Sequence, residues 1–163
     1  MVATSKTLPR FGLGMAALGR PGYINLSRTQ IFDNKESNMN DVQRRSVEAM
    51  QEKANEVMDT LMKESKGNDM LPWFDCARSY GLSEKFVGEF LRGKGVSPNE
   101  VIVSSKWGYT YVGDWKVELE AGEPHEVKDH SVGKFLKQIE ETRTCIGEYV
   151  DLYQVHSATF DSG

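Results

Sequence analysis

The chain has 163 residues, of which 39% are hydrophobic and 27% are charged, and its formal net charge is -4 at pH 7. This balance is typical of a globular domain with its own core, and it excludes a disordered chain. The negative net charge, without any cluster of Lys and Arg, argues against a nucleic-acid partner. No apolar run reaches the roughly 18–20 residues that span a bilayer, so we expect no membrane partner.

The two cysteines, Cys76 and Cys145, lie far apart and show no Cys-x-x-Cys or Cys/His ligand spacing. We interpret them as reduced thiols in a cytoplasmic protein, and we expect no bound metal.

The apolar pattern predicts strands that alternate with helices. We interpret 11–19 as a short buried strand that runs into a glycine-rich turn, and 33–38 as another turn-rich stretch. The predicted elements that follow are a helix over 41–66, a strand over 71–76, a helix over 84–92 capped by Ser83, a strand over 101–104 buried on both faces, a long connection over 107–130, a helix with the apolar stripe Val132, Phe135, Leu136, Ile139 and Ile146, which Gly147 ends, and a strand over 150–155.

About four strands and three helices in alternation indicate βαβ units and a parallel sheet. Four such strands make half of an eight-unit barrel, which needs roughly 250 residues when complete. We therefore expect an α/β fold, the N-terminal half of a (β/α)8 TIM barrel. One domain over 1–163 is expected, truncated after the fourth strand.

Polar residues stand where three of the predicted strands end. Asp75, Lys106 and His156 each follow an apolar strand, and Tyr80 comes five residues after Asp75. Because the carboxyl ends of parallel strands meet at one edge, we expect these four side chains to be neighbours.

This combination indicates proton transfer at a carbonyl group. A tyrosine with a pKa near 10 is a poor acid at neutral pH. A lysine ammonium at about 4 Å favours the phenolate by roughly 4 kcal/mol at an effective dielectric near 20, so it lowers the tyrosine pKa. Asp75 would hold that lysine, and His156 would donate to the carbonyl oxygen. None of these groups supplies a hydride, so the chemistry requires a nicotinamide cofactor.

Three segments resemble the aldo-keto reductase family. The run 75–84 resembles its first signature, Asp-x-Ala-x-x-Tyr-Gly-x-x-Glu, with Gly88 four residues later. Ser104-Ser105-Lys106 is similar to the strand end that carries the family lysine, with Ser105 where Thr is common. The run 150–156 resembles the second signature, a Val-Asp-Leu-Tyr strand that ends in the family histidine.

The resemblance implies catalytic roles for Asp75, Tyr80, Lys106 and His156, with Tyr80 as the proton donor. It implies cofactor contacts at Gly14, Met15, Ala16 and Asp75, with NADP(H) favoured over NAD(H). In this family, the remaining cofactor contacts come from strands five to eight. Structural roles are expected for Glu84 and Asp151, such as hydrogen bonds to neighbouring backbone, and surface-loop positions for His125 and His130.

Aromatic residues gather after Lys106, namely Trp107, Tyr109, Tyr111 and Trp115. Two interpretations remain open. Trp107, Tyr109 and Trp115 line a pocket for a small carbonyl or sugar substrate, or the segment forms an apolar plug of its own.

Two functions are also weighed. The first is an NAD(P)(H)-dependent oxidoreductase that interconverts an aldehyde, ketone or aldose and its alcohol, with Tyr80 as general acid and base. For this chain to have that activity, the missing half of the barrel would come from self-association or from a complementary half-barrel. The second is an inactive truncated half-barrel or an interaction module of the same ancestry.

Overall fold

Four parallel strands form the central sheet of the computed structural model, which describes residues 6, 9–22, 45–116 and 119–158. The strands are β1 (Leu13–Gly14), β2 (Trp73–Asp75), β3 (Ile102–Trp107) and β6 (Val150–Val155), paired in the order β1-β2-β3-β6. Each neighbouring pair is parallel. This confirms the expected α/β fold and the strand order of part of a barrel.

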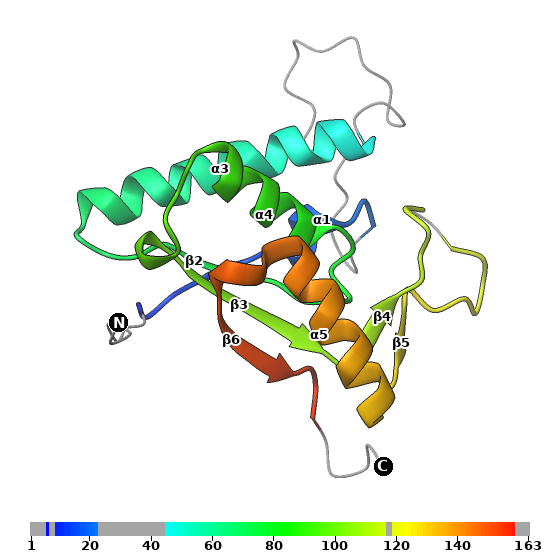
Figure 1. The fold of residues 1–163 in the computed structure, drawn as a ribbon. Helices are drawn as coiled ribbons and strands as arrows, with labels where there is room; N and C mark the ends of the chain where they lie inside the picture. The colour runs from blue at the N-terminus through cyan, green and yellow to red at the C-terminus, as the bar shows by residue number, and fades with distance from the viewer. Residues whose placement is uncertain (1–5, 7–8, 23–44, 117–118, 159–163) are drawn as a thin grey trace, which may run out of the picture.

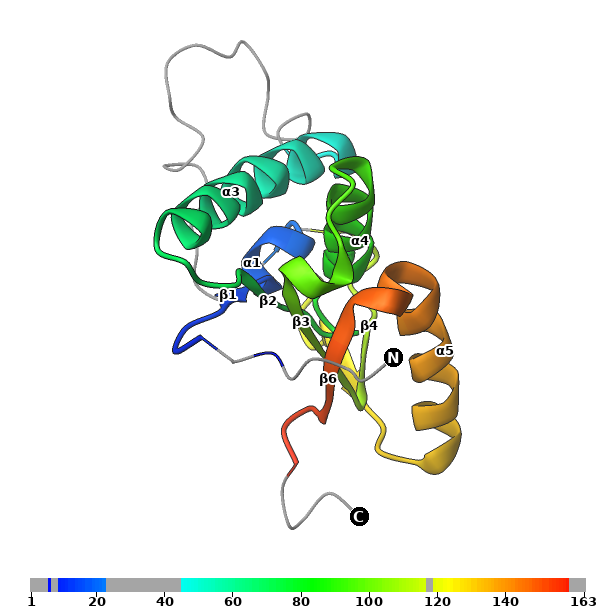
Figure 2. The ribbon, with the colours of Figure 1, turned by 60° about the vertical axis from the view of Figure 1, so that its left-hand side comes forward.

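The helices lie together on one face of this sheet (Figures 1 and 2). They are α1 (Ala16–Gly19), α3 (Val47–Gly67), α4 (Ser83–Gly93) and α5 (Val132–Ile146), and two 3-10 turns, η1 (Pro98–Glu100) and η2 (Gly147–Tyr149), precede β3 and β6. α4 contacts both α3 and α5, so the helices form one layer outside the strands.

A hairpin that the sequence did not reveal lies between β3 and α5. β4 (Tyr109–Tyr111) pairs antiparallel with β5 (Glu126–Lys128), within the stretch predicted as a long connection. Figure 1 shows this hairpin beyond the end of β3. It therefore continues from the edge of the sheet where the carboxyl ends of the parallel strands lie.

The core lies between the sheet and the helices. The predicted stripe of α4, formed by Phe86, Val87, Phe90 and Leu91, is buried, as are Met50, Ala54 and Met58 of α3. Residues 101–105, which lead into β3 and form its first part, are all buried, which confirms a strand covered on both faces.

The predicted face of α5 was partly wrong. Val132 and Leu136 are 74% and 58% exposed, whereas Gln138 and Thr142 are buried with Ile146. Gln138 lies inside because its side chain binds the backbone of Gly108 and Tyr109. Hydrogen-bonded polar groups thus occupy a face that hydrophobic periodicity cannot reveal.

Three smaller expectations also change. Leu13 is only half-buried because β1 lies at the edge of the described sheet, and the predicted turn after it is the helix α1. Ser83 is the first residue of α4 rather than its cap, and its hydroxyl donates to the carbonyl of Ala77 (3.4 Å). The predicted turn at 33–38 and the first predicted helical turn at 41–44 fall outside the described residues.

None of the described helices is both long enough and apolar enough to cross a lipid bilayer.

Gly88→Ala is expected to lower the free energy of unfolding by about 1–3 kcal/mol, because it overpacks the contact between α4 and α5. A Cβ at Gly88 would lie 2.1 Å from the carbonyl oxygen of Cys145. Gly93→Ala is the matched control, since no atom lies within 4 Å of a Cβ at that end of α4. Urea unfolding of both variants measures the difference. Equal stability of the two would contradict the close approach of the helices.

Candidate active site

The four ionisable residues singled out in the sequence come together at one edge of the sheet. Asp75 ends β2, Lys106 is the last but one residue of β3, and His156 directly follows β6. These strands are neighbours and parallel, so their carboxyl ends meet. Tyr80 enters from the turn between β2 and α4.

Lys106 is the centre of the group. Its Nζ lies 2.6 Å from Oδ2 of Asp75 and donates to the carbonyl of Cys76 at 2.9 Å. The same ammonium lies 5.0 Å from the centroid of the Tyr80 ring. A cation over an aromatic ring is stabilised by about 0.5–2 kcal/mol. One ammonium thus links the carboxylate to the phenol ring.

The Tyr80 turn is held by close backbone contact with α1. The amide of Tyr80 donates to Ala77 (3.0 Å), and the amide of Leu82 donates to Gly19 (2.7 Å). Gly81 has a φ of +61°, and a Cβ there would lie 2.4 Å from the carbonyl oxygen of Gly19. Only glycine fits this position, so the local sequence fixes the path of the turn that carries Tyr80.

The ring of His156 meets that of Tyr80 edge-on, with 5.5 Å between centroids and an interplanar angle of 89°. Its Nδ1 lies 3.3 Å from Oγ of Ser79. Burial, followed by the positive charge of Lys106, lowers the pKa of His156 below its usual 6.5. The imidazole is therefore neutral at pH 7.

His156 is expected to make the protein less stable in acid. Its pKa is lower in the folded than in the unfolded chain, so the unfolded chain binds a proton more readily. The stability that the neutral ring contributes is complete above a pH of about 6.5 and is lost as the pH falls through the folded pKa. In His156→Gln, the drop in unfolding free energy between pH 7 and pH 5 should be smaller than in the unchanged protein. Urea unfolding at both pH values tests this, and equal drops would contradict it.

The predicted cofactor contacts at the end of β1 differ in their exposure and in whether their backbone groups are already hydrogen-bonded. Gly14 pairs with Asp75, is exposed, and has no atom within 4 Å of a Cβ position. Met15 is fully buried, its amide donates to Asp75, and its carbonyl accepts from Leu18 and Gly19. Ala16 is half-buried in the first turn of α1. Gly14 is thus the open position of the three.

The three predicted pocket aromatics lie in different surroundings. Tyr109 contacts the ring of His156, with 5.1 Å between centroids. Trp107 packs against Phe135 of α5 at 5.1 Å. Trp115 packs against Phe86 of α4 at 6.2 Å, and its indole donates to the backbone carbonyl of Arg45. Of the three, Tyr109 is therefore the one whose ring contacts a member of the ionisable group, His156, while the two tryptophans pack on helices.

A cavity of about 440 Å³ lies beside the Tyr80 turn, lined by Gly81, Leu82, Val47, Tyr111, Val112, Asp114 and Trp115. Tyr111, the fourth aromatic of the cluster, thus shares a lining with Trp115.

His130 lies in the loop between β5 and α5, as expected, but it is half-buried rather than fully exposed. Its ring lies between Trp107 (5.6 Å) and Tyr109 (5.9 Å), and Nε2 is 3.0 Å from the carbonyl oxygen of His156. Gly108 makes room for it, because a Cβ there would lie 2.2 Å from the ring. His125 is also half-buried, with Nδ1 shielded from solvent. A histidine in a connecting loop carries no sequence signal for such packing.

Other residues near the site were also not predicted. Arg20 is only 4% exposed and donates to the carbonyl of Ser79 at 3.2 Å. It lies 3.4 Å from Glu126 of β5, and its charge helps to lower the pKa of His156. The contact between Arg20 and Glu126 could not be predicted from the sequence, because the two residues are 106 positions apart.

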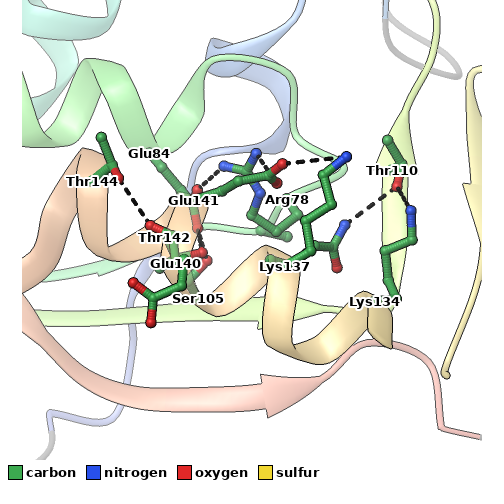
Figure 3. A network of polar contacts seen from close by, with 12 residues as sticks. Arg78, Glu84, Ser105, Thr110, Lys134, Lys137, Glu140, Glu141, Thr142 and Thr144 are labelled. Carbon is green, nitrogen blue, oxygen red and sulfur yellow. Dashed lines mark hydrogen bonds and ion pairs between the residues drawn. The ribbon is translucent and has the colours of Figure 1, made fainter. Parts of the chain in front are cut away.

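A buried polar network holds β3 from the helical side (Figure 3). Glu84 accepts hydrogen bonds from Ser105 (2.6 Å) and Thr142 (2.8 Å), and it pairs with Arg78. Arg78 also contacts Glu141 at 2.8 Å. Ser105 belongs to β3, Glu84 to α4 and Thr142 to α5, so this network ties β3 to the helical layer. Glu84 is structural as expected, although its partners here are side chains rather than backbone.

Asp151 fits its expected role, because Oδ2 accepts from the backbone amide of Val103 at 3.1 Å and Oδ1 from Lys6 at 2.6 Å.

Within the described ranges, no group of three or more His, Cys, Asp or Glu side chains could hold a metal ion. Cys76 is fully buried beside Lys106, and burial raises the pKa of its thiol well above the usual value. The side chain is therefore a protonated thiol packed in the core at neutral pH.

An alternating α/β chain whose polar groups gather at the carboxyl ends of parallel strands has the arrangement found in (β/α) barrels. The sequence model of the aldo/keto reductase family matches residues 38–162. The chain belongs to the aldo/keto reductase family.

Solved structures that match the chain include a proposed aldo-keto reductase from Pseudomonas aeruginosa, with 23% identity and a TM-score of 0.46. The match covers 68% of this chain and 37% of that one. A second structure from the same organism, also of a proposed aldo-keto reductase, gives 22% identity and a TM-score of 0.45, covering 68% and 36% of the two chains. This chain thus matches little more than a third of their length. No curated protein matches it.

Proposed function

We propose that the chain carries the proton-transfer site of a nicotinamide-dependent oxidoreductase, which interconverts an aldehyde, ketone or aldose and the corresponding alcohol. The observation that carries this proposal is the position of Lys106. Its ammonium lies 2.6 Å from the Asp75 carboxylate and 5.0 Å from the Tyr80 ring centroid, and His156 is edge-on to the same ring.

Tyr80 is the general acid in the direction of reduction. A phenol with a usual pKa near 10 needs a neighbouring cation to give up its proton readily at neutral pH. Lys106 provides that cation, and Asp75 holds it in place through the 2.6 Å ion pair. In the reverse direction, the phenolate takes the proton back from the alcohol.

His156 orients the substrate as a neutral donor. Its lowered pKa keeps the ring uncharged at pH 7. We assign the hydroxyl of Ser79, 3.3 Å from Nδ1, as the donor to that nitrogen. This tautomer carries its proton on Nε2, which donates to the carbonyl oxygen. The carbonyl then lies between Nε2 and the Tyr80 hydroxyl.

Gly14 and Asp75 fit the nicotinamide end of a cofactor. Gly14 is exposed beside Asp75, and the space above its Cα is open, so a flat ring can approach the backbone there. The backbone of Met15 and Ala16 shapes the same side. A nicotinamide supplies or accepts the hydride in such reactions. We propose NADP(H) rather than NAD(H), on the family relationship.

The test is a titration of the purified 163-residue protein with NADPH and NADH, followed by reduced-nicotinamide fluorescence. Saturable binding, and then loss of NADPH on addition of aldehydes, ketones or aldoses, is the expected result. A folded protein that binds neither nucleotide would contradict the proposal, and it would favour the alternative of an inactive fragment or interaction module.

A further inference from the structure

Ser104 lies between Trp73 and Asp75 on the site face of the sheet. β2 and β3 pair so that Asp75 is opposite Ser104, and Ser104 is fully buried. The indole Nε1 of Trp73 is 2.8 Å from Oγ of Ser104, and that Oγ is 2.6 Å from Oδ1 of Asp75.

The direction of both hydrogen bonds follows from the chemistry of the groups. An indole N–H only donates, so the Ser104 oxygen accepts from Trp73. A carboxylate only accepts, so the hydroxyl proton of Ser104 points to Asp75. Trp73 thereby fixes the rotation of the hydroxyl, and one orientation of the serine satisfies both neighbours.

Both oxygens of Asp75 are then committed. Oδ1 accepts from Ser104, while Oδ2 accepts from the Lys106 ammonium at 2.6 Å. The carboxylate cannot rotate without breaking one of these charge-assisted bonds. The place of the ammonium beneath the Tyr80 ring therefore depends on Ser104.

Gly12 makes this arrangement possible, since a Cβ there would lie 2.8 Å from Cδ2 of the Trp73 indole. The absent side chain leaves room for the indole beside the start of β1.

We propose that Ser104 is a positioning residue of the site: with Trp73 behind it, it holds Asp75, and through Asp75 it places Lys106 against Tyr80. This inference rests on the proposed function for its effect on turnover. The hydrogen-bonded chain from Trp73 to Lys106 itself does not depend on any substrate.

The first arm of the test measures turnover. Ser104→Ala is expected to lower kcat by up to about 100-fold, the factor that a small misplacement of a reacting group carries, with KM changed little. Trp73→Phe should also lower kcat, but by a smaller factor than Ser104→Ala. Ser105→Ala is the matched control, because this neighbouring buried hydroxyl binds Glu84 on the opposite side of β3. It should leave kcat within about threefold, although the loss of a buried hydrogen bond lowers its midpoint of urea unfolding.

A double-mutant cycle then separates positioning from general damage. If Ser104 acts through Asp75, adding Ser104→Ala to Asp75→Asn should change kcat little further. A full additional loss in the Asp75→Asn background, or equal losses in Ser104→Ala and Ser105→Ala, would overturn the proposal.

The second arm needs no activity. The indole N–H resonance of Trp73, assigned with Trp73→Phe, should shift on Asp75→Asn, and most of this shift should vanish in the Ser104→Ala background. An undiminished shift would overturn the link through Ser104. If the protein binds no nucleotide and reduces no carbonyl, the proposed function fails, and this arm alone decides whether Ser104 holds Asp75.

Discussion

Tyr80→Phe is expected to lower kcat for carbonyl reduction by about 100- to 10,000-fold, the range that a positioned general acid contributes. Phenylalanine keeps the ring beneath which Lys106 lies and which His156 meets edge-on, so the packing of the turn should survive. It removes the hydroxyl proton that we assign to the carbonyl oxygen. Steady-state oxidation of NADPH with an aldehyde substrate measures the loss.

Nucleotide affinity separates this effect from misfolding. The fluorescence titration should give nearly the same dissociation constant for Tyr80→Phe as for the unchanged protein. Tyr149→Phe is a matched control, since its hydroxyl donates to the carbonyl of Val96 rather than to any group of the site (3.1 Å). Its kcat should be unchanged. Turnover retained by Tyr80→Phe would show that another group donates the proton.

The strands and helices with simple patterns were predictable. The run 150–155 is β6 to the residue, because its apolar and β-branched residues stand between two glycine- or turn-containing segments. α4 was predicted to within one residue at each end, because its four apolar residues recur at helical spacing. The bounds of such elements follow from the local sequence, so they can be predicted without knowledge of distant contacts.

The site could be predicted only as a set of positions. Parallel strands bring their carboxyl ends together, and this rule alone placed Asp75, Lys106 and His156 side by side. The partners of these groups could not be found in the same way. Ser104 and Trp73 meet through the register of β2 against β3, and a slip of one residue would put the two side chains on opposite faces of the sheet.

Buried polar residues in the helical layer explain why the buried face of α5 was predicted partly wrongly. Thr142 stands on the buried face of α5 because Glu84 accepts its hydroxyl proton, and Leu136 stands outside. A hydrophobic stripe marks a face only where apolar contact fills it. Where an ionised network fills it, the pattern points to the wrong residues.

Glu84→Ala is expected to have the largest effect on stability, a loss of about 3–5 kcal/mol in the free energy of unfolding. The side chain is 3% exposed and is the common acceptor for Ser105, Thr142 and Arg78. Its removal leaves two buried hydroxyls without their acceptor and takes one partner from a cation that is 21% exposed. Urea unfolding measures the loss.

Two further variants identify which part of Glu84 matters. Glu89→Ala lies on the same helix, where Glu89 is 50% exposed and 3.8 Å from Lys85, and it should change stability by less than about 0.5 kcal/mol. Glu84→Gln keeps an oxygen for the two hydroxyls but turns an NH₂ group toward Arg78, so its loss should fall between the other two. If Glu84→Ala were as mild as Glu89→Ala, the network would not hold β3 to α4 and α5.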